Sequence, residues 1–379
     1  GTVSFAPGET TVEGVKKSVP IKANSAVLLD ASGNPVAPGT PVDALDPEGN
    51  KVGEYTIDPA TNKVTFTPTN KEYKGKVQPA NVQAEDENGT KVKTTYTPTI
   101  VGVTPTAEPA ETTDIQGKEQ TGKPTFTPGN PNVPMDDEVP ATFEDGSKEK
   151  VIPGEGTYTV SPDGTVTFTP EKNFTGKGTG VTVQREDKNG TPVTAKYTPT
   201  VTAVEPTAKP ADSAGVQGET QKGTPTFTAG NAEVPIKENS VKLLNPDGTE
   251  ATGPVDALDP SGKKVWEYTV NPATGEVTFT PNKDFVGTPD GITVQAKDAN
   301  GTPATAKYTP TVTAVTPTAE DVTSTGKQGQ TQKETPKFTE GDSEVPMKID
   351  ADQPAKFIDP ATGEPTDATE LPAMKDGKQ

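Results

Sequence analysis

The sequence of 379 residues contains no cysteine and no histidine. Without cysteine there can be no disulfide, cysteine nucleophile or thiolate metal site, and without histidine there is no imidazole base. Long hydrophobic runs are also missing, since no apolar stretch approaches the roughly 18 residues of a membrane-spanning helix, and no secretory signal sequence is recognisable. These absences remove several classes of enzyme and give no indication of a membrane protein.

Apolar residues are scarce, with hydrophobic residues at 28% and aromatic residues at 5% of the chain. Val, Leu, Ile and Phe together fall below the roughly 20% level at which disorder becomes common. The formal net charge of −19 disfavours nucleic acid and anionic membranes as partners, because both are bound by Lys and Arg patches. The regular patterns described next indicate folded domains with thin cores and modest stability.

One stretch of about 35 residues occurs three times, at 64–99, 166–200 and 277–311. Each copy begins VTFTP and ends YTPT, and successive copies lie about 100 residues apart, which is the size of an autonomous small domain. The sequence therefore predicts a tandem array of four repeats. Their predicted bounds are 1–104, truncated at its start, 105–205, 206–316 and a partial repeat at 317–379.

The repeats differ in detail. The opening GTVSFAPG aligns with 121–129 and pairs Phe5 with Phe126, so we expect the chain to be a fragment of a longer array. The first and third repeats share a longer middle section, whereas the second is shorter and the segment VPMKIDADQPAKFIDP of the fourth is closer to the second. Between repeats, about fifteen residues such as TPTAEPAETTDIQGK are predicted to be an extended linker, too polar and too broken by proline to pack.

Apolar residues alternate with polar ones at a period of two. Tyr268 and Val270 precede a turn, after which Val277 and Phe279 share a face, as in a half-buried hairpin. A second hairpin runs from Ile292 through an Asp-Ala-Asn-Gly turn and back, and its return strand contains Pro310, which predicts an edge or a bulge there. Such short strands, with no helical period, predict antiparallel β-sandwich domains of the Ig-like kind. The predicted cores include the rings Tyr55, Tyr158, Tyr268, Phe66, Phe168 and Phe279.

The ordered string VTFTPxxxFxGxxxGVTVQxxDxNGTxxTAxYTPTV, followed by PTA, QG and PTFTxGxxxVP, resembles the CshA-type fibril repeat. Such repeats form tandem stalks on the surface adhesins of streptococci and related Gram-positive bacteria. The resemblance covers essentially the whole chain, and it implies a secreted, cell-wall-anchored fibrillar protein whose ligand-binding region precedes the repeats. No LPxTG-type sorting motif is present, which fits an internal fragment.

An Asp-x-Asn-Gly motif recurs at 86–89, 187–190 and 298–301. Its oxygens could bind calcium, but a calcium site needs about six ligands and no further acidic cluster recurs in step, so a hairpin turn is favoured. The same Asn residues begin an Asn-Gly-Thr sequence that matches a glycosylation sequon, which we interpret as incidental.

Lys71, Lys172 and Lys283 recur two residues before an aromatic residue. They could form an internal isopeptide cross-link, but their polar surroundings favour a solvated loop. Trp266, the only tryptophan, takes the place of Gly53 and Thr157 and could anchor a ligand, although local packing is favoured. The acidic residues show no recurring pair for acid–base chemistry. We therefore expect no catalytic, cofactor-binding or metal-binding residues, and no enzymatic activity.

Two functions remain. The array can be a structural stalk, a monomeric extended chain that projects a distal ligand-binding tip from the cell wall, while host matrix proteins or other bacteria are bound by regions outside this sequence. Alternatively, each repeat can weakly bind a host protein or glycan, and multivalency makes the binding useful. Shortening the array distinguishes them, because a spacer fails below a threshold length whereas a multivalent binder loses avidity in steps.

Overall fold

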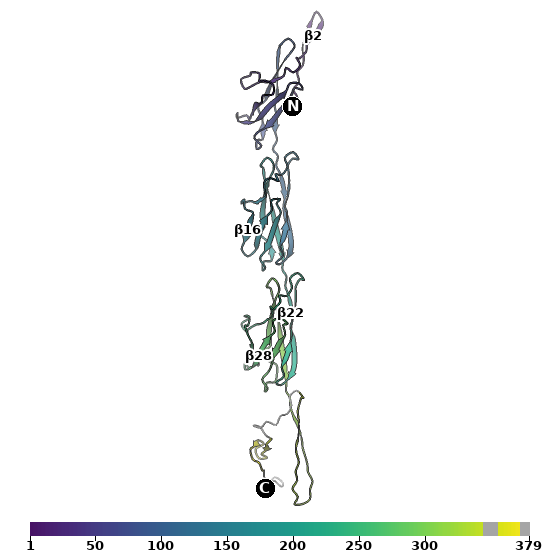
Figure 1. Ribbon diagram of the computed structural model, residues 1–379, viewed down its shortest axis with the longest axis vertical. Coiled ribbons are helices and arrows are strands. Elements are labelled where there is room, and N and C mark those ends of the chain that lie inside the picture. Colours follow the sequence, from purple (N-terminus) through teal and green to yellow (C-terminus); the bar gives the residue numbers. More distant parts are fainter. Residues whose placement is uncertain (344–354, 372–379) are drawn as a thin grey trace. The chain divides into compact units, whose positions relative to one another are not determined.

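Figure 1 shows the computed structural model of the chain, in which residues 1–343 and 355–371 are described. The chain divides into two compact units, Gly1–Ala203 and Val204–Gln379, and each is considered by itself. All helical or strand structure in the described residues is β-strand, so the predicted all-β class is confirmed. The first part of the segment 345–360, on which the likeness of the fourth repeat to the second was based, lies outside the described residues.

The second repeat, in the first unit, consists of two sheets that enclose one hydrophobic core. One sheet has the order β12–β21–β20–β15, with β19 also paired to β21, and the other has the order β13–β18–β17–β16. The short strands β11 and β14 pair with each other. The bounds are β11 (Thr106–Glu108), β12 (Ala110–Ile115), β13 (Gln120–Gly122), β14 (Thr125–Thr127), β15 (Thr142–Phe143), β16 (Glu149–Ile152), β17 (Gly156–Val160), β18 (Val166–Pro170), β19 (Gly176–Lys177), β20 (Val181–Glu186) and β21 (Pro192–Thr202).

The third repeat, in the second unit, has the same arrangement, with sheets ordered β23–β31–β30–β26 and β24–β29–β28–β27. Its bounds are β22 (Thr207–Lys209), β23 (Ala211–Val216), β24 (Gln221–Gly223), β25 (Thr226–Thr228), β26 (Lys242–Leu243), β27 (Val255–Leu258), β28 (Lys264–Val270), β29 (Val277–Phe279), β30 (Ile292–Lys297) and β31 (Pro303–Thr313). The predicted β-sandwich is therefore found in both complete repeats.

The first repeat has two three-stranded sheets, β3–β8–β9 and β4–β5–β6, and carries an exposed hairpin, β1–β2. In the fourth repeat, β32 pairs with β33 and β34 with β35. The bounds are β1 (Gly8–Val12), β2 (Val15–Val19), β3 (Val27–Leu28), β4 (Val42–Leu45), β5 (Lys51–Asp58), β6 (Lys63–Pro68), β7 (Gly75–Lys76), β8 (Ala80–Glu85), β9 (Lys91–Tyr96), β10 (Thr99–Ile100), β32 (Thr318–Glu320), β33 (Lys337–Thr339), β34 (Phe357–Ile358) and β35 (Pro365–Thr366).

The predicted aromatic core is confirmed for five of its six rings. Tyr158 lies directly opposite Phe168 on neighbouring strands with ring centroids 4.5 Å apart, and both rings are fully buried. Tyr268 and Phe279 form the same cross-strand pair at 5.2 Å. In the first repeat Tyr55 is buried, but Phe66 is only half-buried. Residues 1–3 pair with β6 only as far as Val64, so Phe66 has no neighbour where Gln120 lies opposite Phe168.

The predicted fifteen-residue linker between repeats is wrong. The residues assigned to it form β11 and β12, and β12 adds to the edge of a sheet. An edge strand needs only backbone hydrogen bonds and alternate inward side chains, so its polar composition does not prevent it from packing. The true connections between the last strand of one repeat and the first of the next are residues 101–105, 203–206 and 314–317.

Pro310 lies within β31, which is an interior strand between β23 and β30, so the edge predicted there is not found. The pairing is interrupted only locally, on the side that faces β30. β30 pairs with β31 only as far as Tyr308, and Val312 exchanges two hydrogen bonds with Gly287 further along. The nitrogen of Pro310 faces the gap between these two pairings, because residues two apart in a strand point their N–H groups to the same side. No ladder hydrogen bond is lost there.

Candidate functional site: the first and last strands of each repeat

The first long strand of the second repeat lies beside the last, and the two run in the same direction. β12 pairs with β21 from Ala110 opposite Tyr197 to Ile115 opposite Thr202. The third repeat has the same ladder between β23 and β31. Every other ladder between the named strands of the described residues is antiparallel. Because the two strands are parallel, the chain enters each ladder at one end and leaves it at the other (Figure 1).

A buried polar triad joins this ladder to the opposite sheet in the second repeat. The hydroxyl of Thr112, on β12, lies 2.6 Å from the side-chain oxygen of Gln120 on β13 and 2.7 Å from the hydroxyl of Tyr197 on β21. The amide nitrogen of Gln120 donates to the carbonyl of Thr200 at 3.0 Å. Gln120 and Tyr197 are 4% and 0% exposed, so each polar atom of the triad depends on its partners.

The same triad recurs in the third repeat with serine in place of threonine. The Ser213 hydroxyl lies 2.6 Å from the oxygen of Gln221 and 2.7 Å from the hydroxyl of Tyr308. In the fourth repeat Ser324 donates to Gln332 at 2.5 Å. The hydroxyl and the glutamine are eight residues apart in all three repeats, a regularity that could have revealed the triad in the sequence.

A glycine makes room for the tyrosine of each triad. A Cβ atom at Gly122 would lie 2.3 Å from the ring of Tyr197, and one at Gly223 would lie 2.2 Å from the ring of Tyr308. Any larger residue would push the ring away from its hydroxyl partner. Gly1 has the same relation to Tyr96, which supports the alignment of the opening residues with 121–129.

The exit of the third repeat is held by the glutamine of the QG motif. The side-chain oxygen of Gln217 accepts a hydrogen bond from the backbone N–H of Val315 at 2.9 Å, two residues beyond β31. The next residue, Thr316, lies against Gly341, where a Cβ atom would come within 2.5 Å of its carbonyl oxygen. The short connection 314–317 is therefore fixed by contacts on both sides.

The recurring Asp-x-Asn-Gly motif forms the favoured turn. One carboxylate oxygen of Asp298 accepts the backbone N–H groups of Asn300 and Thr302, and Gly301 has a φ of 90°. Asp187 accepts the equivalent pair. Both aspartates are fully buried and their second oxygen has no hydrogen-bond partner. In the described part of the chain no group of three or more His, Cys, Asp or Glu residues could hold a metal ion.

The three recurring lysines, Lys71, Lys172 and Lys283, are exposed. An isopeptide bond requires a desolvated amine, so the solvated-loop interpretation is confirmed and the cross-link interpretation is wrong for these residues.

Trp266 is 51% exposed and lies at a bulge between β27 and β28. In the strand pairing, Trp266 occupies the position that Gly53 has in the first repeat and Gly156 has in the second. The prediction that Thr157 is the equivalent of Trp266 is therefore wrong. Its φ of 151° is a conformation that favours glycine, and Gly156 has 153°. An exposed aromatic residue is thus held in a strained backbone.

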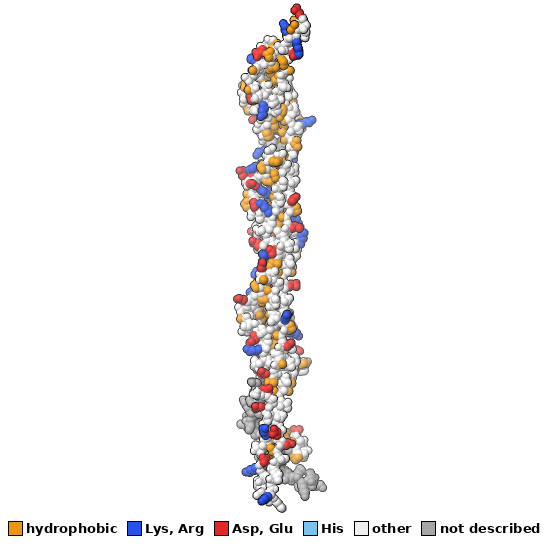
Figure 2. Space-filling model, turned by 90° about the vertical axis from the view of Figure 1, so that its right-hand side faces the viewer, with side chains coloured by type: hydrophobic (Ala, Val, Ile, Leu, Met, Phe, Trp, Pro, Cys, Tyr) orange, Lys and Arg blue, Asp and Glu red, His pale blue; other side chains and the backbone are white. Residues whose placement is uncertain are grey.

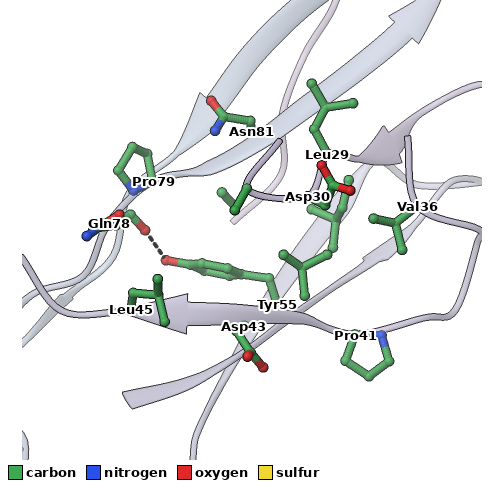
Figure 3. A pocket seen from close by; sticks show the side chains of 14 residues that line it. Leu29, Asp30, Val36, Pro41, Asp43, Leu45, Tyr55, Gln78, Pro79 and Asn81 are labelled. Atoms are coloured by element: carbon green, nitrogen blue, oxygen red, sulfur yellow. Dashed lines mark hydrogen bonds between the residues drawn. The ribbon is translucent and has the colours of Figure 1, made fainter. Parts of the chain in front are cut away.

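A surface pocket of about 580 Å³ lies in the first repeat (Figure 3). Its two carboxylates are already engaged. Asp30 accepts the backbone N–H groups of Ser32 and Asn34, and the hydrogen bond from Asn34 is the main cause of its lowered pKa. Asp43 forms an ion pair with Lys51 at 2.6 Å. The hydroxyl of Tyr55 donates to the carbonyl of Gln78, and burial raises the pKa of Tyr55 to about 12. These groups have structural partners and show no pairing for acid–base chemistry.

Glu155 is a buried carboxylate specific to the second repeat, with 6% of its surface exposed. It accepts hydrogen bonds from the backbone N–H and hydroxyl of Thr179 and from the hydroxyl of Tyr158. Burial, and next the bond to Glu155, raise the pKa of Tyr158. In the third repeat the equivalent Tyr268 donates to a backbone carbonyl instead. The carboxylate of Glu155 therefore holds Tyr158 and Thr179 in the core of the second repeat.

Comparison with known families identifies the chain. The family described as the surface adhesin CshA repetitive domain matches residues 1–100, 102–201, 203–312 and 314–378. The chain belongs to this family, and it is a repeat region of a cell-surface adhesin. No curated protein sequence matches it. None of the described residues forms a helix long and apolar enough to cross a membrane.

Solved structures similar to the chain are tandem arrays. Mouse cadherin-23 EC22-24 is 14% identical, covers 82% of this chain and 93% of its own, and has a TM-score of 0.30. A tetra-tandem repeat from the extending region of a large adhesion protein is 18% identical, with coverages of 80% and 71% and a TM-score of 0.25. The titin I-band fragment I67-I69 is 11% identical, with coverages of 79% and 90% and a TM-score of 0.28. At these TM-scores the likeness carries no argument about this chain.

Proposed function

We propose that this chain is part of the stalk of a fibrillar adhesin, which spaces a distal ligand-binding region from the cell wall of a Gram-positive bacterium. The working units are the four repeats at 1–104, 105–205, 206–316 and 317–379. The stalk is extracellular and monomeric, and host matrix proteins or other bacteria are bound by regions outside this sequence. Chemistry on a substrate is not part of this role.

The observation that carries the proposal is the parallel pairing of the first and last strands. It makes the chain enter and leave each complete repeat at opposite ends, so each repeat adds its own length to the array. Connections of four or five residues leave little slack between repeats. If the chain entered and left a repeat at the same end, that repeat would increase the mass of the array without increasing its length.

The surface suits a spacer. Figure 2 shows acidic and basic side chains interspersed over one face of the molecule, with hydrophobic side chains in small groups between them. Mixed charge on this face (Figure 2), together with the net charge of −19, limits lateral association.

Trp266 favours a second candidate, a multivalent binding array. An exposed tryptophan in a strained backbone at the position of a glycine is a feature that packing alone does not require. In this alternative, each repeat that carries such a tryptophan, as the third repeat does, contributes one weak contact to a host protein or glycan.

A truncation series tests the proposal against this alternative. Zero, one, two or three repeats are placed between a tip domain of known ligand and a cell-wall anchor, and adhesion is measured on cells with a fixed surface coat. A stalk predicts loss of adhesion below a threshold length and full adhesion above it. Stepwise loss with each repeat, or adhesion by repeats without the tip, contradicts the stalk and supports the array.

A further inference from the structure

We propose that the parallel ladders β12–β21 and β23–β31 are force-bearing clamps, which let each repeat resist unfolding when the array is pulled from its ends. The inference rests on the stalk function and adds a mechanical activity to it. A tethered cell transmits load along any stalk, so the load path through each repeat decides whether the stalk holds its length.

The load path follows from the register. Tension from the preceding part of the chain first reaches β11, which pairs with β14 over only three residues, and then reaches β12 at Ala110. Tension from the other side reaches β21 at Thr202, which is the residue opposite Ile115 at the far end of β12. The two strands are therefore pulled in opposite directions along their common axis.

Pulling in this direction shears the ladder. The hydrogen bonds between strands lie across the pulling axis, so the six residue pairs from Ala110 to Ile115 share the load and must yield together. In an antiparallel hairpin pulled open at its free end, the load falls on one pair at a time. The same number of hydrogen bonds therefore resists far more force in the first geometry.

The buried triad strengthens the clamp in a way that the ladder alone does not. Ser213 on β23 contacts both Gln221, on the opposite sheet, and Tyr308 on β31. Gln221 in turn donates to the carbonyl of Thr311 on β31 at 3.0 Å. Sliding β23 along β31 thus breaks side-chain bonds to both sheets at the same moment. Gln217 acts beyond the ladder, because it holds Val315 where the load arrives.

The first repeat provides an internal comparison, because in this chain it has no such ladder. No strand of the described residues pairs in parallel with β9, its last long strand. Its opening residues are held beside β6 by backbone hydrogen bonds. Gly1 and Val64 donate to each other's carbonyl oxygens, and the N–H of Val3 donates to the carbonyl of Asn62. Among its first three repeats, a chain pulled from both ends therefore contains two clamped repeats and one unclamped repeat.

Single-molecule force spectroscopy on the full chain tests the clamp. The protein is tethered at its two ends, and each unfolding event is assigned by its gain in length, about 3.3–3.6 Å for each released residue. Because the chain lacks cysteine, a second pair of handles can be attached at Thr293→Cys and Lys307→Cys, which lie opposite each other on β30 and β31. Pulling on these handles opens the antiparallel hairpin of the same third repeat, with a gain of roughly 50 Å.

The clamp predicts that the second and third repeats unfold at higher force than the first. At one fixed load, the third repeat pulled end to end should survive at least about tenfold longer than its hairpin pulled open. A tenfold change in unfolding rate corresponds roughly to the free energy of one hydrogen bond. The cysteine variant tethered at its ends serves as the control and should match the unmodified chain. Equal forces in both pulling directions, or a first repeat as strong as the others, would overturn the clamp.

The outcome is separable from that of the stalk proposal. A chain that is compact in solution but has direction-dependent strength would contradict the stalk and leave the clamp in place. An extended chain whose repeats unfold equally in both directions would leave the stalk and remove the clamp.

Discussion

At the scale of single residues, the hydroxyl of the triad is the side-chain group that the repeats keep while the rest of the residue varies. Thr112 and Ser213 share the hydroxyl and differ by one methyl group, and each hydroxyl contacts the equivalent glutamine and tyrosine of its repeat. A buried hydrogen-bonding group left without a partner costs more than the bond itself contributes. The hydroxyl should therefore be needed, whereas the methyl group of threonine should not.

Ser213→Ala should lower the free energy of unfolding of the third repeat by about 1–3 kcal/mol, because it leaves Gln221 and Tyr308 buried with one partner fewer. Urea unfolding followed by the fluorescence of Trp266 reports on this repeat alone, since it holds the only tryptophan. Ser213→Thr is the matched control and should stay near the unmodified value. Equal losses in both variants would show that the hydroxyl is not what matters.

Phe279→Ala should cost about 3–5 kcal/mol, the range for a large buried aromatic residue. A domain of this size is stable by about 5–15 kcal/mol, so with a thin core the third repeat should be largely unfolded. The second repeat has its own core and should melt unchanged in calorimetry. One cooperative transition, shifted as a whole, would contradict the independence of the repeats.

The buried tyrosines predict a loss of stability at alkaline pH. Burial raises the pKa of Tyr55 from 10.0 to about 12, so the folded state keeps this proton after the unfolded chain has lost it. Its contribution is fully present below pH 10 and declines as the pH rises from 10 to 12. Melting temperatures measured from pH 8 to pH 12 should be level at first and then fall. Tyr55→Phe should weaken the alkaline fall of the first repeat, and an unchanged slope would contradict this cause.

At the scale of strands and sheets, the antiparallel hairpins could be predicted because large apolar residues alternate with polar residues along their strands. Tyr268, Val277 and Phe279 mark the inward face, and Gly and Asn mark the turns. β12 could not be predicted in the same way. Its alternate half-buried positions are Ala110, Thr112 and Asp114, none of which is a large apolar residue. Its partner is the last strand of the repeat, more than 80 residues away. Proline and acidic residues made it look like a linker.

The triad was missed for a related reason. Its members come from β12, β13 and β21, and only the eight-residue spacing of hydroxyl and glutamine is local. The glycines packed against the tyrosine rings do not lie in turns. They are needed because a larger residue would clash with the ring, and a sequence pattern does not reveal such a contact. By contrast, the turn at Asp298 and the exposure of the recurring lysines could be foreseen, since both depend on neighbouring residues alone.

Hydrogen exchange should show β12 and β23 as parts of the folded repeats. The backbone N–H groups of β12 and β23 that donate to β21 and β31 should exchange slowly, and those of the central strands β20 and β30 should do the same. The connection 101–105 is the matched control in the same chain and should exchange fast. Fast exchange throughout 106–115 would restore the linker interpretation and remove the structural basis of the stalk.

At the scale of the whole molecule, the account depends on each repeat adding to the length of the array. A domain of 100 residues has a radius of gyration of about 13 Å, so each repeat is expected to be roughly 35–40 Å long. Opposite entry and exit points and short connections predict that these lengths add.

Small-angle X-ray scattering of the 379-residue chain in dilute solution tests this most directly. The stalk predicts a maximum dimension well over about 100 Å, with the scattering profile of an elongated particle. Removing the third repeat, residues 206–316, should shorten that dimension by roughly one repeat length of 35–40 Å. A radius of gyration near about 21 Å, the value for a compact globule of this length, would contradict the stalk and favour the clustered binding array.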